Sequence, residues 1–140
     1  MVRVTHHLEH LDEALEELYR VLKPGGVAVI EVANKRTLPK MARYVTFRSK
    51  ENPWSKNPSN YTEICETGFY NYHPKYVEEL FKRIGFKQEK VLSVSNFRSK
   101  TLKKIFRTKG LVKMENTAQE ALAPIRFAPS IYYKLRKPEK

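Results

Sequence analysis

The chain has little of what covalent cross-linking or membrane anchoring requires. Its 140 residues include a single cysteine, Cys65, so no disulfide can form within the chain, and this composition fits a reducing compartment. No apolar run approaches the roughly 20 residues that a membrane-spanning helix needs, and the N-terminus lacks the layout of a signal peptide. We therefore expect a soluble, cytoplasmic protein without a membrane span.

Acidic residues are scarce relative to basic ones. The chain has 27 Lys and Arg against 15 Asp and Glu, a formal net charge of +12. The excess lies in two segments, near 35–60 and 98–123, which interleave basic and aromatic residues as nucleic-acid-binding surfaces do. An anionic substrate, an anionic lipid and RNA are all open as partners, and an ordinary solvated face fits these segments as well.

The strongest structural signal is a helix pattern near the N-terminus. Its apolar residues recur at a spacing that places them on one helical face: Leu8, Leu11, Leu15, Leu18 and Leu22. Asp12 is the natural N-cap, and Pro24 and the two glycines after it end the helix. We expect Gly26 to adopt the positive φ of the turn.

A buried strand follows this turn. Val27-Ala28-Val29-Ile30 has no polar residue, which is typical of a strand covered on both faces in a parallel sheet. Farther on, Pro74 is suited to the first position of a helix that Gly85 ends. A strand over 86–94, with Val91, Leu92 and Val94 inward, and a last strand over 130–135 complete an α/β fold that 140 residues fit as one domain, 1–140.

Two parts of this pattern resemble a known family. The segment Val4–Leu8 with the helix after it, and the run RVLKPGG at 20–26, resemble the second half of a class I S-adenosylmethionine-dependent methyltransferase domain of the type 11 kind. In that family the first segment ends the fourth strand, and RVLKPGG leads into the fifth. Residues 72–86 and 128–133 resemble the next helix and the closing antiparallel strand. The resemblance implies a partial Rossmann-like sandwich of strands four to seven and their helices.

The resemblance also implies an activity and a cofactor. It places Arg3, Val4 and Thr5 beside S-adenosylmethionine, and His7 at the position of the family's recurrent histidine. There His7 orients backbone or substrate, although a histidine bonded under the next helix fits equally well. Because methyl transfer depends largely on positioning, we assign no catalytic base.

Ligands of α/β sheets gather at the carboxyl ends of strands. The residues that leave the expected strand, Asn34, Lys35 and Arg36, are therefore substrate-side candidates. Tyr72 and His73, at the start of the next helix in the resemblance, complete this set.

The family binds its cofactor mainly through a glycine-rich loop and an acidic strand end, and neither pattern occurs here. Of the five glycines, Gly25 and Gly26 form the turn and the others stand alone. The resemblance thus implies a chain lacking the N-terminal cofactor-binding half, as a truncation or as a separately encoded half. We expect this chain alone to be inactive, and its partner to be that missing half or a second copy in a homodimer. The alternative is a non-catalytic α/β module that binds nucleic acid or a partner chain.

One possible metal-binding motif occurs near the N-terminus. His6, Glu9 and His10 have the H-x-x-E-H spacing of inverted zinc peptidases. That chemistry needs both histidines on one helical face and a further protein ligand, whereas a helix capped by Asp12 begins after them. We expect no metal site.

Overall fold

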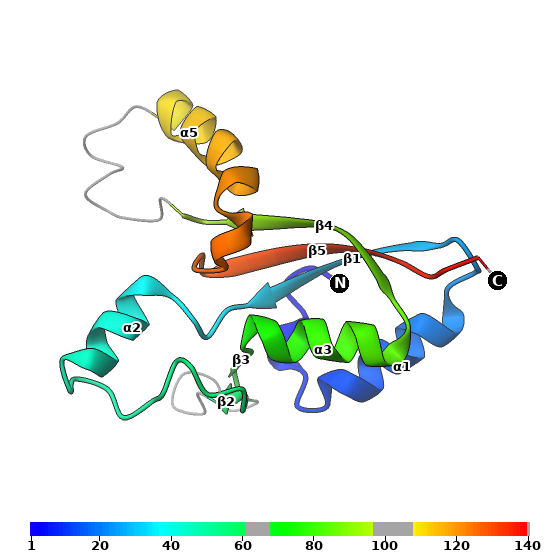
Figure 1. Ribbon diagram of the computed structural model, residues 1–140, viewed down its shortest axis with the longest axis horizontal. Helices are drawn as coiled ribbons and strands as arrows, with labels where there is room; N and C mark the ends of the chain where they lie inside the picture. The colour runs from blue at the N-terminus through cyan, green and yellow to red at the C-terminus, as the bar shows by residue number, and fades with distance from the viewer. Residues whose placement is uncertain (61–67, 97–107, 140) are drawn as a thin grey trace.

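The computed structural model describes residues 1–60, 68–96 and 108–139. Figure 1 shows the arrangement of the helices and strands of these residues, which two short 3₁₀ turns accompany. In chain order the elements are η1 (Thr5–His7), α1 (Leu11–Val21), β1 (Val27–Ala33), α2 (Leu38–Val45), β2 (Ser59–Asn60), β3 (Tyr70–Asn71), α3 (Pro74–Ile84), β4 (Lys87–Val94), α5 (Thr108–Ala121), η2 (Ala123–Ile125) and β5 (Ser130–Arg136).

The last strand lies in the middle of the main sheet. The strand order is β1-β5-β4, and β5 is antiparallel to both neighbours. It follows that β1 and β4 run in the same direction, and that their carboxyl ends lie at the same end of the sheet. The short strands β2 and β3 form a separate antiparallel pair. This arrangement agrees with an α/β class and with the expected last strand, which runs from Ser130 to Arg136.

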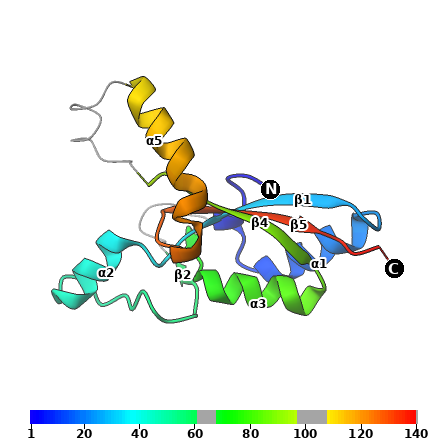
Figure 2. The same cartoon turned by 45° about the horizontal axis from the view of Figure 1, so that its top comes forward.

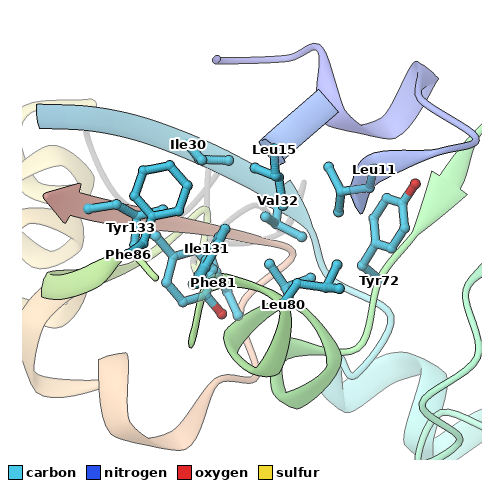
Figure 3. Close-up of a cluster of buried hydrophobic side chains, with 12 residues drawn as sticks. Leu11, Leu15, Ile30, Val32, Tyr72, Leu80, Phe81, Phe86, Ile131 and Tyr133 are labelled. Carbon is cyan, nitrogen blue, oxygen red and sulfur yellow. The ribbon is translucent and has the colours of Figure 1, made fainter. Parts of the chain in front are cut away.

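Helices α1 and α3 lie on one face of the sheet (Figure 1). The hydrophobic core fills the space between these helices and the sheet (Figure 3). From β1 the side chains of Ala28, Ile30 and Val32 are buried, whereas Val27 and Val29 are exposed. The expectation of a strand covered on both faces is therefore wrong for the described residues. Side chains alternate across a strand, so the uninterrupted apolar run puts half of its side chains on the face opposite α1 and α3.

Helix α1 packs as its leucine pattern predicts. Leu11 and Leu15 are buried, and the other three leucines of the pattern pack against the same core. The predicted cap is wrong, because the helix begins one residue before Asp12, with His10 at the N-cap position and no side-chain capping bond. Asp12 instead lies in the first turn, where a carboxylate interacts favourably with the helix dipole.

Both predicted ends of α3 are confirmed. Pro74 is its first residue, and the backbone N–H of Lys75 donates to Nδ1 of His73 at 3.2 Å, which caps the helix. Gly85 follows the last turn with φ of +105°, a conformation that costs glycine nothing. Val77, Leu80 and Phe81 face the core.

The N-terminal segment does not form the expected end of a fourth strand. Met1 alone extends the sheet, since its N donates to Val29 O at 2.7 Å and its O accepts from Glu31 N at 2.9 Å. The chain then turns, because His7 N bonds back to Val4 O at 2.9 Å and the Thr5 hydroxyl donates to Glu31 O at 2.6 Å. Among the described residues, no strand precedes β1 and the outer face of the sheet has no covering helix at Val27, so a complete sandwich is not formed.

The inward residues of β4 also differ from expectation. Ser93 is buried and Val91 packs against the core, while Leu92 and Val94 are only partly buried. Because alternate residues share a face, Val91 and Ser93 point one way and Leu92 and Val94 the other. The prediction of all three apolar residues as inward ignored this alternation.

Helix α5 extends away from the sheet beyond β4 (Figures 1 and 2). It forms part of the second basic segment; residues 98–107 of that segment and Cys65 lie outside the described residues. None of the helices in the described part of the chain is both long and apolar enough to cross a bilayer.

The turn between α1 and β1 uses its glycines differently from the prediction. Gly25 has the positive φ, +75°, and Gly26 does not. Gly26 is required for another reason. A Cβ at this position would lie 2.7 Å from the backbone oxygen of Lys23, to which Gly26 N also donates a hydrogen bond of 2.8 Å.

Gly26→Val should therefore destabilise the fold, by about 1–3 kcal/mol, because the added side chain forces the turn open. Lys23→Ala removes an exposed side chain from the same turn and should change stability by no more than about 0.5 kcal/mol. Urea unfolding followed by circular dichroism compares the two variants. Equal losses in both would contradict this account of the turn.

Candidate functional site

A cavity lies where β1 and β4 end. Its volume is about 1060 Å³, and its lining includes the last residues of both strands and the first residues of β5. The N-terminal segment, the start of α2 and η2 close it from other sides. Carboxyl ends of parallel strands are the usual ligand position in α/β sheets, and this volume accommodates a small molecule.

Glu31 supplies the negative charge of the cavity. It is the only charged residue of β1, and the strand register places Tyr132 of β5 directly opposite it. Burial and the adjacent Glu31 carboxylate raise the pKa of the Tyr132 hydroxyl, which therefore stays protonated and can donate a hydrogen bond. The backbone N–H of Arg3 donates to Glu31 Oε2 at 2.9 Å, which fixes one carboxylate oxygen and leaves the group facing the cavity.

His6 is a further titratable group of the lining. Its ring lies 4.5 Å from the ring of Phe69, centroid to centroid, and 4.2 Å from that of His7. Burial, and then the neighbouring His7, lowers the pKa of His6. Its imidazole is therefore neutral at physiological pH and can accept a proton from a bound ligand.

Asn34 holds the cavity wall together. Its side chain is buried, and the two hydrogens of Nδ2 are shared among the backbone oxygens of Arg36, Arg126 and Ala128, which lie at 3.0, 2.8 and 2.8 Å. Its Oδ1 accepts from Arg36 N at 2.8 Å. One side chain thus joins the end of β1 to the segment that enters β5, which makes Asn34 a positioning residue in the cavity lining.

The four predicted cofactor-side residues do not share one surface. Arg3 lines the cavity, and Val4 is exposed outside it. Thr5 is buried and engaged with the backbone of β1. His7 is exposed, with its ring tilted against that of His6, and the histidine in the cavity lining is His6.

The remaining substrate-side candidates gather at the start of α3, outside the cavity lining. Lys35 N donates to Tyr72 O at 3.0 Å, and the buried Lys35 ammonium donates to Asn57 O at 2.8 Å. The Tyr72 hydroxyl donates to Leu8 O inside the core, and its pKa is raised by burial. These contacts give Lys35 and Tyr72 structural partners.

His73 and Arg36 lie in a strongly basic environment. Burial lowers the pKa of the His73 imidazole, and the positive charges of Arg36, Lys35, Lys75 and Lys56 lower it further. The Arg36 guanidinium lies over the ring of Phe127, 4.6 Å from its centroid. Of the substrate-side set, only Asn34 reaches the cavity itself.

Sequence reasoning missed Glu31, Tyr132 and His6. One signal was available for Glu31, because it interrupts an otherwise apolar strand, and a lone charge there needs a reason. Tyr132 could not be found from sequence, since it meets Glu31 only through the register of two strands a hundred residues apart. Within the described residues, no group of three or more His, Cys, Asp and Glu side chains is placed to hold a metal ion.

Comparison with known proteins agrees with this architecture. A sequence profile described as a methyltransferase domain matches residues 1–115. No curated protein matches the chain. Among solved structures, the chain is similar to a methyltransferase of Thermotoga maritima, with a TM-score of 0.56 at 13% identity. The match covers 98% of this chain and 53% of the Thermotoga maritima chain, which is described as S-adenosylmethionine-dependent and as a possible histamine N-methyltransferase.

Two further structures give the same result. An S-adenosylmethionine-dependent methyltransferase of Mesorhizobium loti has a TM-score of 0.55 at 11% identity, with 96% of this chain and 58% of that one covered. An S-adenosylmethionine-dependent methyltransferase of Archaeoglobus fulgidus has a TM-score of 0.51 at 19% identity, with 98% of this chain and 57% of that one covered. The chain therefore spans little more than half the length of these structures. Because the profile matches most of its length, the chain belongs to the methyltransferase domain family, and the similar structures show that it has the α/β fold of S-adenosylmethionine-dependent methyltransferases.

Proposed function

We propose that this chain is the acceptor-side half of an S-adenosylmethionine-dependent methyltransferase. The observation that carries the proposal is the cavity at the carboxyl ends of β1 and β4, in a chain that matches the methyltransferase profile. When bound, S-adenosylmethionine supplies an electrophilic methyl group. The chain's own contribution is to hold and orient the methyl acceptor, and such positioning supplies much of the rate of a methyl transfer.

Three side chains have roles in this proposal. The Glu31 carboxylate accepts a hydrogen bond from the methyl acceptor and so orients it. The protonated Tyr132 hydroxyl donates a hydrogen bond to that carboxylate. The neutral His6 imidazole accepts the proton that an amine or hydroxyl acceptor loses on methylation. Arg3, beside Glu31, borders the cofactor side.

The lining fits the acceptor better than the cofactor. No glycine is present among the described residues that line the cavity. The backbone therefore offers no position where the ribose or the methionine part of S-adenosylmethionine could approach it unusually closely. We infer that a separate N-terminal half supplies this cradle. The exposed Val27 and Val29 on the outer sheet face are suited to be covered by that half or by a second copy of the chain.

The isolated chain is therefore expected to bind S-adenosylmethionine more weakly than about 100 μM, or less than about 5.5 kcal/mol of binding free energy. Isothermal titration calorimetry measures this directly, with S-adenosylhomocysteine as a second ligand. A low-micromolar dissociation constant would show that the chain needs no second half for affinity.

Joining the chain to the glycine-rich half, encoded upstream or by a separate gene, tests the activity itself. The joined protein should bind at least about 100-fold more tightly and transfer labelled methyl groups, with loss of transfer but not of cofactor binding in Glu31→Gln. Light scattering on the isolated chain should detect a homodimer, and on the mixed halves a complex. If the joined protein neither binds the cofactor nor transfers methyl groups, the chain is a non-catalytic binding module.

A further inference from the structure

Helix α2 exposes its apolar side. At 100° per residue, Leu38, Ala42 and Val45 share one face, and all three are exposed, Leu38 by 60% and Val45 by 63%. The partly buried residues lie on another side, and none of the eight residues of the helix is buried. A helix that packs on a protein core shows the opposite arrangement.

The apolar surface continues past the end of the helix. Phe47 is 97% exposed, with φ of +56°, so its ring makes almost no contact with the protein. The helix is held from behind, where the ring of Tyr44 meets that of Trp54 edge-on at 5.5 Å and Lys40 pairs with Glu51 at 3.9 Å. These contacts keep the apolar side facing outward.

Basic residues surround this apolar surface. Arg43, Arg48 and Lys50 are exposed, and within the described residues no salt bridge to a carboxylate is formed by any of them. Residues 35–60 contain seven basic side chains and one acidic one. We use the term α2 surface for Leu38, Ala42, Val45 and Phe47 together with Arg43, Arg48 and Lys50.

We propose that the α2 surface binds an anionic lipid membrane. Apolar side chains that enter the acyl boundary, with arginine and lysine at the headgroup level, are the pattern of helices that lie in a membrane interface, and each basic residue adds attraction to an anionic leaflet. A single-stranded nucleic acid would use flat aromatic rings for stacking, whereas Leu38 and Val45 are aliphatic. A second copy is disfavoured because two basic surfaces repel each other.

The position of α2 connects this surface with the cavity. Leu38, Pro39 and Lys40 are in the first turn of the helix and also line the cavity. Figure 2 shows α2 extending from the end of β1, away from α1 and α3. A membrane bound by the α2 surface would therefore lie beside the cavity, and this binding does not depend on methyl transfer.

Vesicle sedimentation tests the proposal. The chain should bind vesicles of phosphatidylcholine and phosphatidylglycerol at least about tenfold more tightly than vesicles of phosphatidylcholine alone. The preference should disappear between about 0.1 M and 1 M salt, as the screening length falls from about 10 Å to about 3 Å. Val45→Ser/Phe47→Ser and Arg43→Ala/Arg48→Ala should each weaken binding to the anionic vesicles at least about fivefold.

Matched variants separate this surface from general charge and hydrophobicity. Val21→Ser changes a valine that is 60% exposed on α1, and Lys82→Ala/Lys87→Ala removes two exposed charges from α3 and β4. Both should bind as the unchanged chain does, with circular dichroism confirming that every variant is folded. Equal binding to both kinds of vesicle, or equal loss in the matched variants, would overturn the proposal. So would RNA binding that depends on the arginines with no vesicle binding, or self-association that Val45→Ser/Phe47→Ser abolishes.

Discussion

Phe81→Ala is expected to lower the free energy of unfolding by about 3–5 kcal/mol, a loss comparable to the stability of a small domain. Phe81 is fully buried on α3, where its ring lies 5.1 Å from that of Tyr133 on β5 and 6.3 Å from that of Phe86. Removing it leaves a cavity between the helix layer and the central strand. Urea unfolding of both proteins, followed by circular dichroism, measures the difference.

The chain provides its own control for this substitution. Phe47→Ala makes the same chemical change at a side chain that is 97% exposed, so it should alter stability by no more than about 0.5 kcal/mol. Similar midpoints for the two variants would mean that Phe81 is not in the core. The pair thus tests whether α3 is seated on the sheet as described.

Asn34→Ala should cost about 2–4 kcal/mol of stability. The substitution removes the partner of three backbone oxygens, those of Arg36, Arg126 and Ala128, and buried polar groups that lose a partner cost about 1–3 kcal/mol each before relaxation. Because these bonds join β1 to the entrance of β5, amide hydrogen exchange should also increase around 126–130. Chemical denaturation and hydrogen exchange together check both effects.

Asn116→Ala is the matched control. Asn116 is exposed in the middle of α5, where alanine is a better helix former than asparagine, so stability should stay the same or rise slightly. If Asn34→Ala behaves like Asn116→Ala, the three bonds of Asn34 are replaced by water and the cavity wall does not depend on them.

The helices were predictable because their signals are local. The leucine spacing of α1 places the residues that face the core, and Pro74 and Gly85 mark the ends of α3. Each signal acts within one helix, through side-chain spacing or through backbone conformation. The errors were equally local in scale, such as the cap at His10 in place of Asp12 and the positive φ at Gly25 in place of Gly26.

The candidate site depended on contacts between distant segments. Of the predicted site residues, Arg3 and Asn34 line the cavity, whereas Tyr72 and His73 lie outside it at the start of α3. The strand-end rule points to an edge of the sheet. It does not say which side chains of that edge turn toward the cavity, because this depends on twist and on neighbouring strands.

By itself the sequence determined the α/β class, the helices that cover the sheet and the family resemblance, since periodicity, caps and the RVLKPGG run are all read within short segments. Tertiary structure alone decided that β5 enters between β1 and β4, that Tyr132 meets Glu31, and that α2 turns its apolar face outward. These features follow from long-range strand pairing, where a shift of one residue would reverse every side chain. The outward apolar face of α2 depends on which surfaces the rest of the chain covers, and no short segment of sequence contains that information.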